Sequence, residues 1–474
     1  VTMNFQRSSI KIFTSQAGGS IIGFGAIVIF ARQLQVAELG SFFLFQMLVS
    51  LLAVPASFGR GNAVIKKISE GTQTGNILAT SIVFLVLANG ILVVGIILSR
   101  QYINQYIGVT VAFLVAVGIV LRSLYTLPMN VLKGELRVDE AATLNLLQKF
   151  AWTAVSLILI QYGFGVFALI YGLLASYLVT MIGGVYKVSI QVGKPSLDAA
   201  KSLFNYWKYT IFSFIDSQIY SWTDIAVIGL FLTQSEVGIY EVAWRVTTAV
   251  ILLSTAIERI ILPQISSWDA SESTEKIQNL FPNAILASSF LVIPAFFGVL
   301  VLSSEILGII FGNEYAAGGG ILVVLVFSKL VESIDRIVKN FLEGLDFPDL
   351  RMQAVVVSIV LNVILNLLLV WNFGMIGAAI ATTIAFSSST VITVYYLSNI
   401  MDMKLMHREI GWCILSGTGM LLILLYSRTL LSVDSMLNLL LMILIGVISY
   451  FAFVLLYSPI RLKIRYNINK ALEQ

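Results

Sequence analysis

The sequence contains very little cysteine and histidine. Its 474 residues include one cysteine, Cys413, and one histidine, His407. A single cysteine cannot close an intrachain disulfide, and structural zinc sites are usually built from several Cys and His ligands. These absences exclude a disulfide-stapled fold and argue against a Cys/His metal centre, so we predict no cofactor.

Charged residues are also scarce. They make up 11% of the chain against 58% hydrophobic residues, and the mean hydropathy is +0.93. One soluble core could not cover this much apolar surface, so part of the solvent must be lipid. The basic residues are spread over many short segments, which does not favour a nucleic-acid-binding surface. The sequence has no Gly-x-x-x-x-Gly-Lys-Ser/Thr loop and no nucleophile-with-base pattern, so we predict that it is not an enzyme.

The chain has long apolar runs instead. Residues 352–401 carry no charge and are interrupted by one turn at 371–374, and residues 150–186 are built in the same way. A spanning helix needs about 20 mostly apolar residues, and these runs lack the alternation of barrel strands. We therefore predict an all-α polytopic membrane protein of about fourteen spans. They lie near 12–31, 41–59, 76–99, 106–127, 141–161, 165–186, 207–232, 237–262, 280–302, 316–338, 351–371, 375–397, 409–429 and 436–457.

The basic residues predict how these spans are oriented. With the N-terminus in the cytoplasm, 21 of the 29 Lys and Arg residues fall in cytoplasmic segments. Cytoplasmic loops are enriched in Lys and Arg, so we predict a multi-pass protein of the cell (plasma or inner) membrane with both termini cytoplasmic. The basic tail after residue 460 is expected to contact anionic membrane lipids.

Short motifs recur along the chain at offsets of 198, 210 and 209 residues. The matched pairs are 37–42 with 235–240, 130–134 with 340–344, and Phe164-Gly165 with Phe373-Gly374. Six spans separate the copies, and since six is even, both copies start on the same side of the membrane. We therefore predict two parallel six-helix lobes, 1–190 and 206–400, and two further helices within 401–474. Such lobes can enclose a cavity and work by alternating access.

Charged residues inside the spans are the best site candidates, because a charge in the bilayer is costly. Asp224 and Arg245 lie at similar depth in neighbouring spans, within about one helical turn of each other. We predict that they form an ion pair. The pair either neutralises two buried charges or takes part in gating or ion coupling.

A second group lies closer to the predicted cytoplasmic side. Arg122, Lys149 and Asp216 are at similar estimated depth, so the two cations could bind an anionic head group while Asp216 couples its release to an ion. Neutralisation between helices, or snorkelling of Lys149, is the alternative. Tyr220 and Trp222 could stack on a sugar ring or pack between helices.

Span 316–338 has a charged end. Lys329, Glu332, Asp335 and Arg336 are spaced so that they can pair along one helix. We expect these charges to neutralise one another.

Several short stretches are shared with a known family. They are Arg32 to Gly40, Phe58-Gly59, 222–229, 236–240 and 311–315. On these residues the chain resembles the polysaccharide transporter (oligosaccharide flippase) family of the multidrug/oligosaccharidyl-lipid/polysaccharide exporter superfamily. The resemblance implies a fourteen-helix protein that moves an undecaprenyl- or dolichyl-linked oligosaccharide to the outer leaflet.

The function expected from this resemblance is a flippase for surface polysaccharide or glycoprotein assembly, working by alternating access. Its partners would be the lipid-linked oligosaccharide and membrane lipids, with H⁺ or Na⁺ as candidate coupling ions. One rival is an ion-coupled drug or small-molecule exporter of the same superfamily. Another is a membrane glycan transferase or polymerase.

Overall fold

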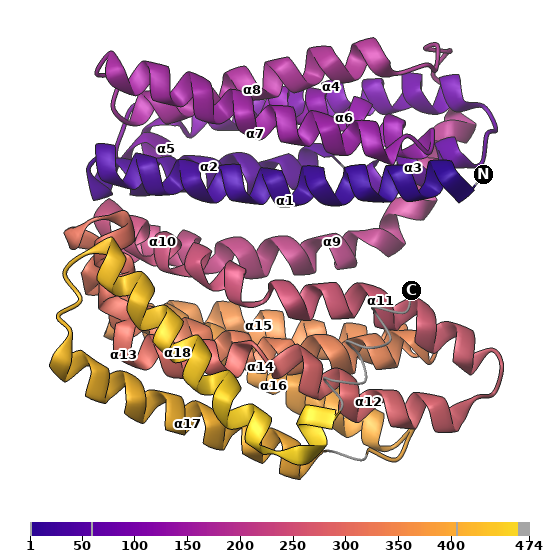
Figure 1. The fold of residues 1–474 in the computed structure, drawn as a ribbon. Coiled ribbons are helices and arrows are strands. Elements are labelled where there is room, and N and C mark those ends of the chain that lie inside the picture. The colour runs from indigo at the N-terminus through magenta and orange to yellow at the C-terminus, as the bar shows by residue number, and fades with distance from the viewer. Residues whose placement is uncertain (1, 58–59, 404–405, 463–474) are drawn as a thin grey trace. The chain divides into compact units, whose positions relative to one another are not determined.

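The computed structural model describes the backbone of residues 2–57, 60–403 and 406–462. It describes their side chains except at 2–10, 12–13, 55–57, 60, 206–221 and 253. This part of the chain is helical and contains no strand (Figure 1). The helices are α1 Thr2–Gln33, α2 Val36–Ser57, α3 Arg60–Ser69, α4 Thr74–Leu98, α5 Arg100–Ile107, α6 Ala112–Gly134, α7 Val138–Gln161, α8 Val166–Lys187, α9 Leu197–Phe231, α10 Gln234–Val250, α11 Leu252–Asp269, α12 Thr274–Ser289, α13 Val292–Phe311, the 3₁₀ turn η1 Asn313–Gly318, α14 Gly319–Gly344, α15 Pro348–Phe373, α16 Met375–Ser398, α17 His407–Leu430 and α18 Met436–Leu456.

The protein is a multi-pass membrane protein. Eleven described helical segments are long and apolar enough to cross a membrane, and the bent pair α10 and α11 would make twelve. The predicted spans 207–232, 237–262 and 316–338 lie outside the eleven. The count of fourteen is therefore not confirmed.

Each of these three predicted spans falls outside the eleven apolar segments for a different reason. In α9 the described apolar stretch is the short segment Trp222–Phe231. Helices α10 and α11 meet at a bend of 52°, so they form one span only if a broken helix is accepted. Helix α14 carries five charged residues between Lys329 and Lys339, which exceeds the charge that an apolar span tolerates.

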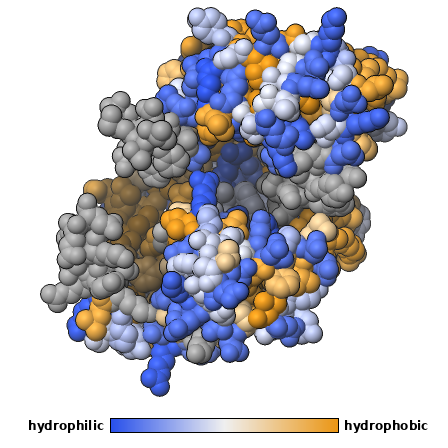
Figure 2. All heavy atoms as spheres, turned by 90° about the vertical axis from the view of Figure 1, so that its right-hand side faces the viewer, coloured by the Kyte–Doolittle hydropathy of each residue, from blue (hydrophilic) through white to orange (hydrophobic). Residues whose placement is uncertain are grey.

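The outer faces of several helices are apolar, as lipid contact requires. The clearest case is α4, whose exposed side chains include Val83, Val86, Leu87, Ile91, Val94, Ile97 and Leu98. Such a stripe would be an aggregation-prone patch in water but is the normal surface of a helix in hydrocarbon. Figure 2 shows hydrophilic and hydrophobic residues mixed over the face that it draws.

The chain divides into two compact units, Val1–Gly238 and Ile239–Gln474. In the first unit α7 packs against α1 and α8, and α6 packs against α2, α3, α4 and α8. In the second unit α14, α15 and α16 pack together, and α17 and α18 pack against each other and against α13. The lobe limits expected from the repeat, 1–190 and 206–400, remain a prediction, as does the separate pair of helices within 401–474.

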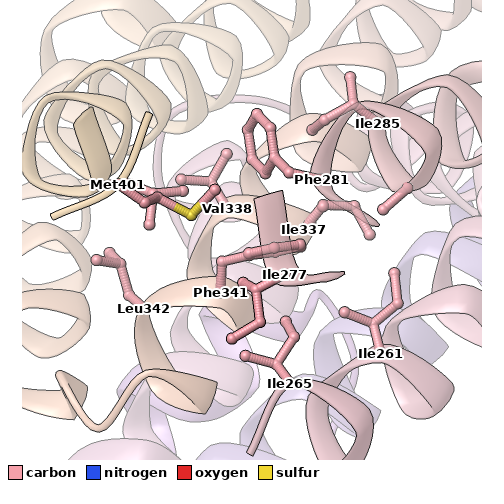
Figure 3. Close-up of a cluster of buried hydrophobic side chains, with 12 residues drawn as sticks. Ile261, Ile265, Ile277, Phe281, Ile285, Ile337, Val338, Phe341, Leu342 and Met401 are labelled. Carbon is pink, nitrogen blue, oxygen red and sulfur yellow. The ribbon is translucent and has the colours of Figure 1, made fainter. Parts of the chain in front are cut away.

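A cluster of large apolar side chains fixes one end of α14 (Figure 3). Phe341 of α14 meets Phe281 of α12 edge to face, with ring centroids 5.0 Å apart. Ile265 of α11 and Leu342 belong to the same buried cluster. Edge-to-face pairs add about 0.5–1.5 kcal/mol to the effect of burial, so this cluster holds the three helices together.

The sequence repeat reappears as matching turn geometry. After α6, the Arg137 N–H donates to the carbonyl of Leu132 over 2.9 Å. After α14, the Phe347 N–H donates to the carbonyl of Leu342 over 2.8 Å. Both are the six-to-one hydrogen bonds of a Schellman ending, and they lie 210 positions apart. The two copies of this motif therefore end their helices in the same way.

The two copies of the Glu-x-Gly motif also begin their helices alike. Glu38 accepts a hydrogen bond from the Gln35 N–H at 3.1 Å, and Glu236 accepts one from the Thr233 N–H at 2.9 Å. Each carboxylate reaches back three residues to satisfy a backbone donor that precedes the helix, as in a capping box. The acidic residue of this motif is thus explained by helix capping.

The glycines of the same motif lie at a backbone crossing within the first unit. A Cβ placed on Gly40 would lie 1.7 Å from the carbonyl oxygen of Gln234, and one on Gly238 would lie 2.5 Å from that of Val36. Both the glycines and the carbonyls are 198 positions apart, so the contact is reciprocal. Only glycine allows the first turns of α2 and α10 to approach this closely.

Candidate functional site

Arg122 is half-buried on α6 and lies beside two tyrosine side chains. Its Nη1 lies 3.3 Å from the hydroxyl of Tyr177 on α8, which in turn stacks on Tyr125 with ring centroids 4.9 Å apart. No carboxylate among the described residues pairs with this guanidinium. The positive charge is therefore oriented by neutral groups and available to an anion.

Lys149 is half-buried on α7 and lies against α1. A Cβ placed on Gly19 would be 3.5 Å from the Lys149 ammonium nitrogen, so the small residue makes room for the lysine stem. Lys149 thus faces α1, while Arg122 contacts α8. Joint binding of one ligand by both residues remains a prediction.

The predicted coupling residues are only partly described. Asp224 is buried at 3% exposure in α9. Arg245 pairs with Glu241, one turn earlier on α10, at 2.8 Å. The pairing of Asp224 with Arg245 stays a prediction. The side chains of Asp216 and Tyr220 lie outside the described residues, and Trp222 is half-buried.

The densest group of buried charges lies on α14. Lys329 and Arg336 both pair with Glu332 at 2.7 Å. The Lys329 ammonium also lies 3.9 Å from the ring centroid of Trp244 on α10, a cation–π contact. The expectation that these charges neutralise one another is confirmed for Lys329, Glu332 and Arg336, whereas Asp335 pairs with Lys339. The contribution of Trp244 could not be read from spacing, because it comes from another helix.

Further partners from neighbouring helices complete this group. Asp335 pairs with Lys339 at 2.7 Å and accepts a hydrogen bond from Ser389 of α16 at 2.9 Å. Arg336 also pairs with Glu258 of α11 at 2.8 Å. Three cations therefore face three carboxylates, and the α14 network is neutral within itself. A neutral, saturated network suits the locking of helices better than the binding of a charged ligand.

A pocket of about 430 Å³ lies in the first unit beside the turn at 163–165. Its lining includes Glu38, Ser41, Gly108, Phe164, Phe167 and Gln234. The wall therefore combines two aromatic rings with an amide and a carboxylate. Among the described residues, no group of three or more His, Cys, Asp or Glu side chains could hold a metal ion.

The end of the first unit that is predicted to be cytoplasmic carries a surface ion network. Arg137 pairs with Glu140 at 2.7 Å and with Glu135 at 2.9 Å, and Lys187 also pairs with Glu140 at 2.6 Å. The hydrogen bond to Glu140 raises the pKa of Arg137 above its ordinary value. Glu135 also accepts the Ser189 N–H at 2.9 Å. These bonds hold the segment after α8 against the turn between α6 and α7.

Comparison with known proteins places more than half of the chain in a family. A family model described as "Polysaccharide biosynthesis protein" matches residues 29–318. The chain is 42% identical over 459 residues to a Haloferax volcanii protein named "Probable low-salt glycan biosynthesis flippase Agl15", covering 97% of both chains. It is 32% identical to "Probable flippase AglR" of the same organism, covering 82% of both.

Solved structures share the fold at low sequence identity. The lipid II flippase MurJ in an inward closed conformation matches with a TM-score of 0.81 and 17% identity, over 94% of this chain and 98% of that one. An inward-facing multidrug resistance MATE family transporter of the MOP superfamily matches with a TM-score of 0.68 and 15% identity, over 81% and 94%. The all-helical fold of this chain is therefore one that membrane transporters use.

Proposed function

Because the chain belongs to the polysaccharide biosynthesis protein family, we propose that it flips a polyprenyl-linked oligosaccharide from the cytoplasmic to the outer leaflet of the cell membrane. The observation that carries this proposal is the match, over 97% of both chains, to a relative named as a glycan biosynthesis flippase. Alternating access of two lobes would move the head group, and both termini would be cytoplasmic.

The chemistry of such a substrate fits the charges of the first unit. A phosphate or diphosphate linked to sugars needs a polar, partly cationic path, while its polyprenyl chain can stay in lipid. Arg122 has no carboxylate partner among the described residues, and we assign it, with Lys149, to the head group. Tyr220 and Trp222 are proposed to contact sugar rings.

Ion coupling forms the second part of the proposal. We assign Asp216, Asp224 and Arg245 to gating or to coupling with H⁺ or Na⁺. The burial of Asp224 supports this, since carboxylates inside membrane proteins often mark the pathway of an ion or a proton.

The decisive experiment measures transport by the purified protein in proteoliposomes. A labelled lipid-linked oligosaccharide should move across the bilayer with wild-type protein. The Arg122→Ala, Lys149→Ala double variant should lose at least about tenfold in rate, since each charge-assisted hydrogen bond contributes roughly 1.5–3 kcal/mol. Lys194→Ala, which removes an exposed cation from the segment before α9, is the matched control. Wild-type rates in the double variant would refute the roles of these two residues.

A further inference from the structure

Helix α6 presents two cations on one face. Arg122 and Lys133 are eleven residues apart, which is close to three turns, so their side chains point in nearly the same direction. Thr126 lies between them on the same face and donates its hydroxyl to the Arg122 carbonyl. The cations are roughly 16 Å apart along the axis. Both are half-buried, with Lys133 in the last turn of the helix.

Neither cation is neutralised by a described residue. Arg122 meets the Tyr177 hydroxyl, and the Lys133 ammonium makes no hydrogen bond or ion pair with any residue that the structure describes. A half-buried charge without a counterion is costly, because it has lost part of its water and gained no partner. The α6 face therefore carries two positive charges that have no carboxylate partner among the described residues and could bind an anion.

Other cations near this end of the unit are satisfied. Lys11 pairs with Asp139 at 3.0 Å, and Lys67 pairs with Glu70 at 2.8 Å. Lys194 is exposed and can be hydrated by solvent. Lys133 thus differs from these neighbours in being half-buried without a partner among the described side chains.

The second unit shows the opposite arrangement at the repeated position. The position that matches Lys133 in the second motif copy, 210 residues later, is occupied by Glu343, which pairs with Arg351. The described deep cations of α14 are also paired with carboxylates. An anion-binding face is therefore a property of α6 and not of its counterpart.

We propose that this face of α6 is a two-step binding site for the phosphate or diphosphate of the lipid carrier. Lys133 makes the first contact near the predicted cytoplasmic end, and Arg122 receives the group deeper in the helix. A lysine suits the first step as a flexible point charge, and an arginine suits the second because its fork can bind two phosphate oxygens. This inference rests on the proposed function for its substrate class.

The same phosphate chemistry has two sources in a membrane, the carrier lipid and bulk anionic phospholipid. The test uses full-length protein in nanodiscs of zwitterionic phosphatidylcholine, titrated with geranylgeranyl diphosphate as the probe. Lys133→Ala and Arg122→Ala should each weaken binding about tenfold, because each removes one charge-assisted contact. Lys133→Arg should keep most of the affinity, and the control Lys194→Ala should bind as the wild type does. Inorganic pyrophosphate should compete with the probe.

Three results would overturn the site. The first is wild-type affinity in Lys133→Ala, and the second is failure of pyrophosphate to compete with the probe. The third is that phosphatidylglycerol, added to the nanodisc, lowers probe binding as much as pyrophosphate does. The last result would make Lys133 an anchor for bulk lipid. Transport measured in parallel separates the two proposals. Binding that depends on Lys133 without any flipping would refute the proposed function and keep the site, whereas flipping without such binding would refute the site alone.

Discussion

Lys329 and Lys133 are both lysines on long helices of the protein, and their surroundings give them different roles. Lys329 is 3% exposed and is held by Glu332 and the Trp244 ring. Lys133 is half-buried and has no described partner. A saturated buried charge fixes structure, whereas an unsatisfied one is free to bind a ligand. Whether a charged side chain has a protein partner, and not how deeply it is buried, therefore distinguishes structural charges from charges that can bind a ligand.

At this scale we predict that Glu332→Gln destabilises the protein strongly. The substitution removes the carboxylate shared by Lys329 and Arg336 and leaves two cations without their common acceptor. Breaking a buried pair in this way costs about 3–5 kcal/mol. Thermal unfolding of the purified variant should show a clear fall in Tm.

The matched control is Glu70→Gln, which removes an exposed carboxylate that pairs with Lys67. Exposed pairs contribute little, so its Tm should stay near the wild-type value. An unchanged Tm in Glu332→Gln would show that the α14 network does not hold the second unit together.

At the scale of helices, the crossing of α2 with the first turn of α10 leaves less room for a Cβ at Gly40 than any other described glycine of the first unit has. The reciprocal pairing of Gly40 and Gly238 with the opposite carbonyls shows why the Glu-x-Gly motif occurs twice. Its glutamates cap the two helices and its glycines let them touch. A repeated short motif can therefore indicate that its two copies contact each other, in addition to indicating a duplicated fold.

We predict that Gly40→Ala separates these two helices. The added methyl group would lie 1.7 Å from the Gln234 carbonyl oxygen, which is backbone and cannot rotate away. Overpacking of this kind costs about 1–3 kcal/mol, so the Tm should fall and transport should be impaired. Gly90→Ala on α4 is the control, since nothing lies within 4 Å of its Cβ and alanine favours the helix. Equal stability of the two variants would mean that the crossing is looser than the structure indicates.

For the whole molecule, the sequence predicted the helical class, the repeat motifs and the membrane setting, because these depend on apolar runs and local spacing. It did not predict the bend between α10 and α11 or the charged character that sets α14 apart from the apolar spans. Partners such as Trp244 and Glu258 were also missed, since contacts between helices are invisible to spacing along one helix. The predicted span 106–127 leaves Lys133 in a loop, whereas in the structure α6 continues to Gly134 and Lys133 is half-buried.

The orientation of the whole chain is testable by thiol labelling. In a Cys413→Ser background, Tyr162→Cys and Asn372→Cys should react with an impermeant reagent added outside the cell, because both positions are exposed and lie in predicted outer loops. Lys194→Cys lies in the predicted cytoplasmic segment before α9 and should react only after the membrane is opened. Cys413 itself is fully buried, so its removal should take away background labelling without exposing a new site. The reverse labelling pattern would invert the topology and would place Lys133 at the outer surface, where it could not receive a head group from the cytoplasm.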